Sequence, residues 1–512
     1  MRRILRGVFS RVVVVSLLLI LQLALMFFSL IRISEYFMYV SITLRLLSLI
    51  TVVIIINRHS SPSYKLAWIV PILIFPLFGG LFYLFVTGQM HTKKFFNRLS
   101  ESEKKINGLY PQSCEILREI GEKYPYREPT VHYINKVSGL SAYKSYETKY
   151  FPLGEDMFRD ILTELENAEK YIFLEFFIIK EGKMWNSILE ILKKKASAGI
   201  DVRVMYDGMG SMTLLPKNYP QTLKKFGIKC CVFSPFTPFL SSLQNNRDHR
   251  KIIVIDGKIA YSGGINLSDE YINECSPYGH WKDMAVCIKG PAAFSFSRMF
   301  LHLWWHTTKT SGDIRQFEPV FSKEYFKNRS QGFVMPYADM PQDNHLTGEF
   351  MYLDIISKAR KYVYITTPYL ILDHKMMSAL ANSAKSGVDV RIICPLATDH
   401  WYAREVAYSY YRELIESGVK MYEYAPGFIH GKTVCSDDEV AVVGSINLDY
   451  RSLYLHFECA TLFIGEPVVY SILNDFNRTL KKCRAITIDS CTKMNLFRRI
   501  LGAILGLFAP LM

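Results

Sequence analysis

The sequence lacks several features of small proteins stabilised by disulfides or zinc and of disordered proteins. It contains no Cys-x-x-Cys pair, which argues against a zinc ribbon. Its ten cysteines are spread over 512 residues, far too long a chain for a small disulfide framework. Only 21% of the residues are charged while 50% are hydrophobic, and a disordered chain would carry more charge for that apolar content. The length instead allows two or three folded domains.

The charge balance of the chain is basic. Lys and Arg total 61 and Asp and Glu total 47, which gives a formal net charge of +14. This balance suits anionic partners, namely lipid head groups, nucleic acid or phosphorylated substrates. Four cysteines stand within apolar runs, at Cys287, Cys394, Cys435 and Cys459. We expect them to be buried reduced thiols, which favours a reducing compartment.

Three long apolar runs near the N-terminus predict a membrane anchor. The first, 12–31, carries no charge, and its length of about 20 residues matches a hydrocarbon core about 30 Å thick. The second, 36–56, contains Arg45, and the third, 66–86, is uncharged but contains Pro and Gly. No small-residue cleavage site follows the first run, so we expect it to be retained. We predict two to three transmembrane helices within residues 1–90, the alternative for each run being a buried core helix.

An internal repeat organises the rest of the chain. In each copy an apolar strand pattern is followed by a helix that ends at Gly, a second strand, another helix and a third strand. The matching segments are 170–178 with 361–369, 198–204 with 386–392, and 226–235 with 417–426. A β-α-β-α-β pattern that occurs twice predicts two similar α/β lobes.

These patterns divide the chain into five predicted parts. They are an anchor over 1–90, a linker over 91–130, a first lobe over 131–330, a second lobe over 331–490 and a tail over 491–512. The uncharged end of the tail is too short to span a membrane. We therefore expect an amphipathic helix that lies on the membrane surface, or alternatively a terminal helix packed on the lobe.

Each repeat reaches the same set of polar residues. The shared spacing is His-x-Lys-x4-Asp-x6-Gly-x2-Asn, and two copies at matching repeat positions exclude a chance match. The residues are His249, Lys251, Asp256, Gly263 and Asn266 in the first copy and His430, Lys432, Asp437, Gly444 and Asn447 in the second.

The spacing has a chemical meaning. On a strand, His and Lys two residues apart point to the same face, so an ammonium group can neutralise a phosphate oxygen beside the imidazole. The Asn amide can donate a further hydrogen bond to that phosphate. Two such half-sites facing each other would allow one imidazole to attack phosphorus while the other protonates the leaving oxygen. No metal ion is required, because the lysines stabilise the developing charge. Asp256 and Asp437 either take part in this chemistry or end the strand and position the turn.

The two motifs resemble the duplicated HKD motifs of the phospholipase D superfamily, over residues 130–490. The apolar stretch 68–83 and the segments 264–271, 281–283, 447–452 and 457–458 are similar to those of bacterial cardiolipin synthases. One departure is Gly264, where the second motif has Ser445. The extra apolar run before the usual membrane hairpin is another.

The resemblance implies a phosphatidyltransferase that joins two phosphatidylglycerol molecules to give cardiolipin and glycerol. His249 would be the nucleophile that forms a phosphatidyl-histidine, and His430 the general acid and then base, although the residues alone do not rank the two. Asp283 and Glu458 would orient the histidines, the alternative being ordinary surface carboxylates. No cofactor or metal is implied.

The expected partners are phosphatidylglycerol, other anionic phospholipids and a bacterial cell membrane, with no nucleic acid. Basic residues are equally numerous on alternate sides of the three runs, so they do not decide the orientation of a multi-pass anchor. The reduced cysteines favour catalytic lobes on the cytoplasmic face.

Other functions remain open at this point. The same site would serve a phospholipase D that transfers the phosphatidyl group to water. A nuclease of the superfamily is disfavoured, because nucleic acid gives no reason for three apolar runs. From another class, the chain could be a non-catalytic scaffold that binds anionic lipids. Alternative phosphatidyl donors or acceptors, acyl-chain preference and oligomeric state are not readable from the sequence.

Overall fold

The computed structural model describes residues 35–58, 62–75, 80, 83, 90–236, 242–327, 330–341, 345–492 and 495–509. The chain forms two compact units. One comprises Phe96–Pro235 and Arg247–Gly502, and the other comprises Met1–Phe95, Phe236–Asn246 and Ala503–Met512. The first of these units contains both predicted lobes except residues 236–246.

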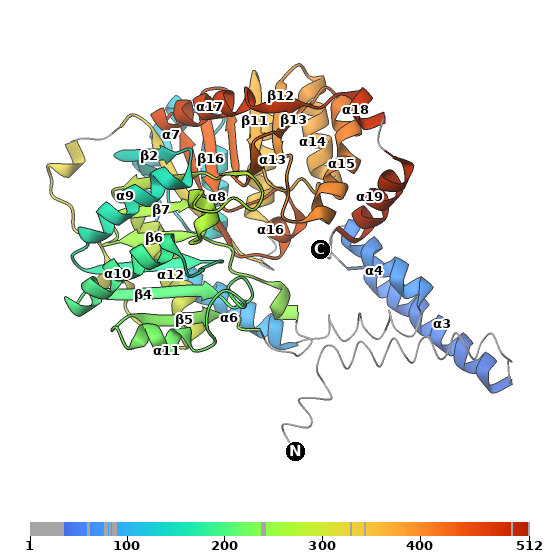
Figure 1. Cartoon of the computed structure of the whole chain (residues 1–512), viewed down its shortest axis with the longest axis horizontal. Coiled ribbons are helices and arrows are strands. Elements are labelled where there is room, and N and C mark those ends of the chain that lie inside the picture. Colours follow the sequence, from blue (N-terminus) through green and yellow to red (C-terminus); the bar gives the residue numbers. More distant parts are fainter. Residues whose placement is uncertain are drawn as a thin grey trace. The chain divides into compact units, whose positions relative to one another are not determined.

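The first lobe is built on a seven-stranded sheet with the order β2-β9-β7-β6-β3-β4-β5 (Figure 1). The β3-β4-β5 pairs, at one end of the sheet, are parallel, and the remaining pairs are antiparallel. Every residue of β3 is buried, as expected for a parallel strand with both faces covered. The strands are β2 (Glu147–Phe151), β3 (Tyr171–Phe176), β4 (Asp201–Asp207), β5 (Lys229–Phe233), β6 (Ile252–Ile255), β7 (Ile259–Gly263) and β9 (Ala285–Lys289).

Helices cover both faces of this sheet. Alternate residues of β3 point to opposite faces. Ile172 and Leu174 join the core that contains Trp185 of α10 (Lys183–Ser197) and residues of α9 (Gly154–Glu166). On the other face, the ring of Phe173 stacks on Phe300 of α12 (Ala293–Thr308), with ring centroids 4.6 Å apart. The lobe is therefore a three-layered α/β structure.

The second lobe repeats this plan in a nine-stranded sheet. Its order is β1-β10-β17-β16-β15-β11-β12-β13-β18, in which the run from β17 to β13 matches β9-β7-β6-β3-β4-β5 of the first lobe. Helix α17 takes the place of α12, and α13 and α14 take the places of α9 and α10. The elements are β10 (Phe333–Asp339), α13 (Thr347–Lys358), β11 (Tyr362–Thr366), α14 (His374–Lys385), β12 (Asp389–Pro395), α15 (Trp401–Glu416), β13 (Lys420–Tyr424), β15 (Thr433–Ser436), β16 (Val440–Gly444), α16 (Tyr450–Tyr454), β17 (Glu458–Ile464), α17 (Pro467–Leu480) and β18 (Cys483–Ala485). The predicted pair of similar α/β lobes is confirmed.

Residues that precede the first lobe in sequence complete the second lobe. Strand β1 (Tyr143–Lys144) pairs with β10. Ile120 of α7 (Cys114–Lys123) and Ile134 of α8 (Glu128–Ser138) are fully buried in the core of the second lobe. The segment predicted as a linker and the start of the first lobe therefore contribute to the second hydrophobic core.

A pair of symmetric crossings joins the lobes. Strand β8 (His280–Lys282) of the first lobe pairs in parallel with β14 (Gly427–Ile429) of the second. An isolated bridge joins Asp248 to Phe457 in the same manner. Each lobe thus extends a segment into the other, directly beside the two histidine motifs.

The predicted membrane runs fall partly on two helices. The run 12–31 lies outside the described residues, 36–56 falls on α3 (Glu35–Ile56), and α4 (Pro62–Ile74) covers part of the third run. The two helices pack through a small core that includes Ile55 and Trp68. No helix within the described residues is both long enough and apolar enough to cross a membrane, so the predicted transmembrane helices are not found in this part of the chain.

The tail forms the helix α19 (Leu496–Phe508). The Arg498 guanidinium makes a bidentate pair with Glu405 of α15, at 2.9 and 2.5 Å. Phe497, Ile500 and Ile504 are exposed. The first turns of the tail therefore pack on the second lobe. This agrees with the alternative expectation of a terminal helix packed on the lobe.

The remaining helices complete the fold. They are α6 (Met90–Asn107), α11 (Tyr219–Lys224), α18 (Ile488–Thr492) and the 3-10 helices η1 (Ser242–Asn245), η2 (Asp269–Ile272), η3 (Ile314–Phe317) and η4 (Tyr325–Lys327). All ten cysteines are free, and the four expected in the core are buried.

Candidate active site

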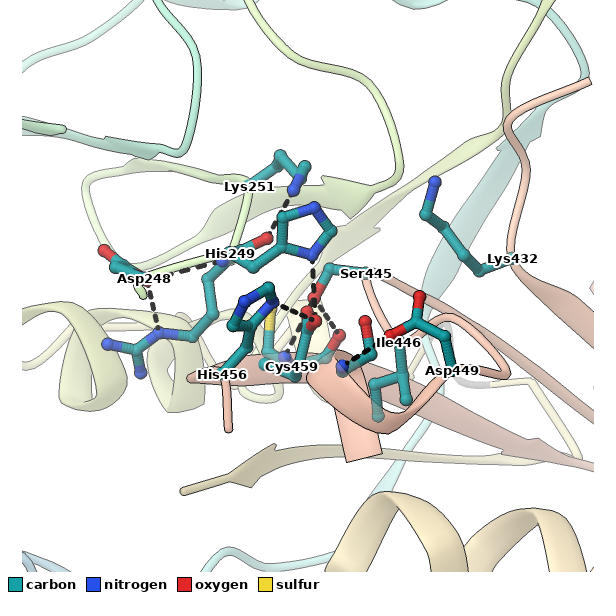
Figure 2. Close-up of polar contacts among 12 residues, drawn as sticks. Asp248, His249, Lys251, Lys432, Ser445, Ile446, Asp449, His456 and Cys459 are labelled. Atoms are coloured by element: carbon teal, nitrogen blue, oxygen red, sulfur yellow. Dashed lines mark hydrogen bonds and ion pairs between the residues drawn. The ribbon is translucent and has the colours of Figure 1, made fainter. Parts of the chain in front are cut away.

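The first half-site forms where the segment before β6 crosses into the second lobe. The backbone N–H of His249 donates to the carbonyl of Phe457 at 2.9 Å. The ring Nδ1 lies 2.8 Å from Oε1 of Glu458, at the start of β17, and both residues are buried. Figure 2 shows His249 with Lys251 and His456 around it. A carboxylate on Nδ1 fixes the orientation of the imidazole and leaves Nε2 as the other reactive nitrogen.

The second half-site repeats this geometry with the lobes exchanged. The N–H of His430 donates to the carbonyl of Lys282 at 2.7 Å. The ring Nδ1 lies 2.6 Å from Oδ2 of Asp283. Asp283 belongs to the first lobe and Glu458 to the second, so each histidine is oriented by a carboxylate of the opposite lobe. Neither half-site is complete within one lobe.

The two lysines of the motifs lie in the same buried site. Lys251 Nζ donates to the carbonyl of His249, and Lys432 Nζ donates to the carbonyl of His430 and lies 2.9 Å from its Nδ1. Burial lowers the pKa of Lys251 to about 7, with the Glu458 carboxylate opposing that shift. Burial also lowers the pKa of Lys432 to about 8, with Asp283 and Glu458 opposing it. An anionic substrate would favour both ammonium forms.

The same surroundings keep the histidines neutral when no anion is present. Burial lowers the pKa of His249 well below its usual range, and the charges of Lys251 and Lys432 lower it further. Burial and Lys432 likewise lower the pKa of His430, which Asp283 partly offsets. The site therefore brings two buried lysines beside two buried histidines, and the charged lysines would favour an anionic group there.

The two asparagines of the motifs differ in their contacts. Asn266 donates from Nδ2 to the hydroxyl of Tyr271 at 2.7 Å and accepts at Oδ1 from the N–H of Ile178 at 3.1 Å. Asn447 hydrogen-bonds to Asp449, which helps keep that carboxyl ionised against the burial that raises its pKa. The side-chain oxygen of Asn447 has no hydrogen-bond partner within the described part of the chain. Both asparagines thus hold loops at the site, and Asn447 has more unused hydrogen-bonding capacity.

The two aspartates of the motifs lie at the far ends of their strands from the histidines. Asp256 accepts hydrogen bonds from the backbone N–H groups of Glu169, Lys170 and Tyr171 at 2.7–2.9 Å. Asp437 accepts from three equivalent N–H groups at the start of β11. Both residues have positive φ, 53° and 58°, a turn conformation that Asp tolerates. These contacts favour the turn-positioning alternative over direct chemistry.

The departure at Gly264 has a steric cause. A Cβ at Gly264 would lie 2.2 Å from Oδ1 of Asp283. In the other half-site, the equivalent Ser445 donates its hydroxyl to Oε2 of Glu458. Glu458 therefore accepts a hydrogen bond from the Ser445 hydroxyl, whereas the Asp283 carboxylate occupies the space that a side chain at Gly264 would fill.

Several groups at the site carry no signal in the motifs. The ring of Tyr271 lies 5.6 Å from that of His430, and His456 lies 5.4 Å from His249, measured between ring centroids. Both lie outside the repeated His-x-Lys motifs, and local spacing assigns a role to neither of them.

A buried ionic cluster supports the segment that carries His249. Arg250 lies 2.6 Å from Glu175 of β3 and 3.4 Å from Asp248. Burial raises the pKa of both carboxyl groups, and the Arg250 charge opposes this shift. The cluster anchors the residues on either side of the histidine.

Comparisons with known proteins agree with this geometry. The family model described as cardiolipin synthase, PLD-like domain matches residues 161–304 and 352–480, which cover both half-sites. A second family model, phospholipase D-nuclease N-terminal, matches residues 46–86.

Individual relatives extend over most of the chain. A cardiolipin synthase of Halalkalibacterium halodurans is 33% identical over 92% of this chain and 93% of its own length. An uncharacterized protein of Streptococcus mutans is 42% identical over 90% of this chain and 99% of its own. The crystal structure of phosphatidylserine synthase from Haemophilus influenzae has the same fold, with a TM-score of 0.56 and 15% identity over 74% of this chain and 97% of that one. The chain therefore belongs to the cardiolipin synthase family of phospholipase D-like proteins.

Proposed function

We propose that this protein is a phosphatidyltransferase that makes cardiolipin and glycerol from two molecules of phosphatidylglycerol. The observation that supports this most directly is the meeting of two His-Lys half-sites, each histidine bonded to a carboxylate of the opposite lobe. Both Nδ1 atoms face carboxylates, so both Nε2 atoms are free for chemistry at one phosphodiester. The relatives named cardiolipin synthase support this substrate.

In the first step, the Nε2 lone pair of His249 attacks the phosphorus of one phosphatidylglycerol. A P–N bond forms and the P–O bond to the head-group glycerol breaks. His430 gives the proton on its Nε2 to the glycerol oxygen, so that neutral glycerol leaves. The phosphodiester anion offsets the charges of Lys251 and Lys432, which raises the pKa of His430 and favours its protonated form at this step.

In the second step, a glycerol hydroxyl of another phosphatidylglycerol attacks the phosphatidyl-histidine. His430 takes the hydroxyl proton, the new P–O bond forms, and the P–N bond breaks to return the electron pair to His249. Lys251 and Lys432 stabilise the charge on the phosphoryl oxygens in both steps. Glu458 stabilises the positive charge that His249 carries as the intermediate.

We also propose that the protein acts at the bacterial cell membrane. Its substrates are lipids, and the N-terminal region matches a family model of its own. Helix α3 exposes large apolar side chains along its length, among them Leu46, Leu49 and Val53, which suit contact with lipid. In this proposal residues 1–90 form the anchor, and the lobes face the cytoplasm.

Lipid mass spectrometry of the purified full chain tests the proposed reaction. The protein is incubated with phosphatidylglycerol alone in detergent micelles that contain EDTA. We expect cardiolipin and an equal amount of glycerol from the wild type, and neither from His249→Ala or His430→Ala. His132→Ala, which removes an exposed histidine of α8, is the matched control and should retain activity.

Other products would change the assignment. Phosphatidic acid as the main product would replace the transferase with a hydrolase. No product from any phospholipid, together with retained lipid binding, would favour the non-catalytic scaffold.

A further inference from the structure

The two half-sites differ at one equivalent position. Their equivalence follows from the backbone, because the N–H of His249 bonds to the carbonyl of Phe457 as that of His430 bonds to the carbonyl of Lys282. The residues that precede these two carbonyl acceptors, Phe457 and Lys282, are therefore equivalent. They are Trp281 beside His430 and His456 beside His249.

His456 brings a second imidazole to the first half-site. It is 9% exposed, and neither of its ring nitrogens makes a hydrogen bond within the described residues. Its Nδ1 lies 3.8 Å from Oε1 of Glu458, the same oxygen that lies 2.8 Å from Nδ1 of His249 (Figure 2). A buried imidazole with unused nitrogens, aimed at a carboxylate, is unusual unless a ligand satisfies it.

The three side chains have the composition and spacing of a metal site. One ligand atom from each of His249, His456 and Glu458 can be chosen so that all lie within 4.8 Å of one another. A tetrahedral Zn²⁺ ion with bonds of about 2.0–2.2 Å places its ligands about 3.3 Å apart. The separations of 2.8 and 3.8 Å from the shared Glu458 oxygen bracket that value. Small side-chain rotations would therefore bring the three atoms to one ion.

We infer that His249, Glu458 and His456 form a binding site for a zinc-like transition-metal ion, which inhibits the enzyme reversibly by capturing its nucleophile. Two imidazoles and one carboxylate match the ligand preference of Zn²⁺ and leave a fourth position for water. Lys251 and Lys432 stand nearby and repel a cation, so we expect weaker binding than at a four-ligand structural site. Among the described residues, no group of three metal-ligating side chains includes His430, and Trp281 occupies the position equivalent to His456.

The chemistry of the capture is a ligand exchange. The ion takes the place of the proton on His249 Nδ1, and that proton passes to solvent. Glu458 then binds the ion and no longer accepts a hydrogen bond from the histidine. The metal draws electron density from the ring, so Nε2 becomes a poorer nucleophile. This inhibition rests on the proposed function, whereas the binding of the ion does not.

Direct binding and activity are measured on the same full-length preparations. Zinc bound per chain is measured by equilibrium dialysis against Zn²⁺ and elemental analysis, and Co²⁺ provides an absorption spectrum that reports tetrahedral nitrogen and oxygen ligands. The variants are His456→Asn and His456→Gln, with His132→Asn as the matched surface control. Activity with Zn²⁺ is expressed as a fraction of each variant's own activity without it, and EDTA is then added.

We expect the wild type and His132→Asn to bind one more equivalent of Zn²⁺ than the two His456 variants. Zinc should inhibit the first two proteins at least tenfold, EDTA should restore them, and the His456 variants should resist. Equal zinc binding by the wild type and both His456 variants would overturn the site. Zinc binding that depends on His456 in a protein without transferase activity would leave the site intact and refute the proposed function instead.

Discussion

The exchange of carboxylates between the lobes makes a prediction that two isosteric variants can test. Glu458→Gln and Asp283→Asn preserve side-chain shape but remove the negative charge that faces each histidine. The bonds they weaken join buried groups at 2.8 and 2.6 Å. A hydrogen bond to a charged group contributes about 1.5–3 kcal/mol. At 1.36 kcal/mol for each tenfold in rate, each variant should lose about 10- to 100-fold in kcat.

A change of leaving group then separates the two histidines. Phosphatidylglycerol needs a proton on its departing glycerol, whereas a phosphatidyl ester of p-nitrophenol releases a stable anion without one. With the nitrophenyl ester, formation of the intermediate should recover in His430→Ala and Asp283→Asn. His249→Ala and Glu458→Gln should stay impaired, because the nucleophile or its orientation is lost. Release of p-nitrophenolate in a single turnover is the measurement.

The test depends on which variants recover together with the nitrophenyl ester. If Glu458→Gln recovered together with His430→Ala, the crossed pairing would be refuted. If the pairs stayed together but His249→Ala and Glu458→Gln were the ones to recover, the pairing would stand and the roles of the histidines would be reversed.

Three further predictions concern charge and stability. First, kcat/KM should fall as pH rises through about 7 to 8, because Lys251 and Lys432 lose their protons in the free enzyme. The fall in kcat should come only at higher pH, because a bound phosphodiester favours the ammonium forms. A kcat/KM profile that is flat to pH 9 would contradict this. Second, Asp256→Asn should lower the free energy of unfolding by about 2 kcal/mol in urea titrations, since it weakens hydrogen bonds to a charged acceptor, while folded protein keeps its activity; a selective loss of kcat would instead make Asp256 catalytic. Third, Arg250→Met should destabilise the protein by about 3–5 kcal/mol, because two buried carboxyl groups lose their cation, and an unchanged melting temperature would refute this.

The sequence predicts much of the fold because the chain repeats itself. Matching strands, glycine-terminated helices and the spacing from His249 to Asn266 indicate two related lobes without knowledge of any contact. The sequence does not predict that Ile120 and Ile134 belong to the second lobe, because their packing partners lie hundreds of residues away. Hydrophobic periodicity shows that a helix has an apolar face but does not show which core receives it.

In the candidate site, too, local patterns are predictable from the sequence and contacts between the lobes are not. The motifs identify His249 and His430, but the exchange of Asp283 and Glu458 depends on how two lobes pair, which local spacing does not encode. For Asp256 the sequence leaves chemistry and turn positioning both open. Its regular place in the motif suggests chemistry, whereas its carboxylate satisfies the first N–H groups of a neighbouring strand.

The crossed carboxylates also bear on biosynthesis. A ribosome completes the first lobe's sheet long before it reaches Glu458, so the nascent chain carries His249 without the carboxylate that orients it. The second lobe, in turn, extends its sheet with strand β1, which precedes the strands of the first lobe's sheet in sequence. A chain that stops before Glu458 therefore keeps His249 but lacks the carboxylate that its Nδ1 faces, so the paired site forms only after both lobes have been made.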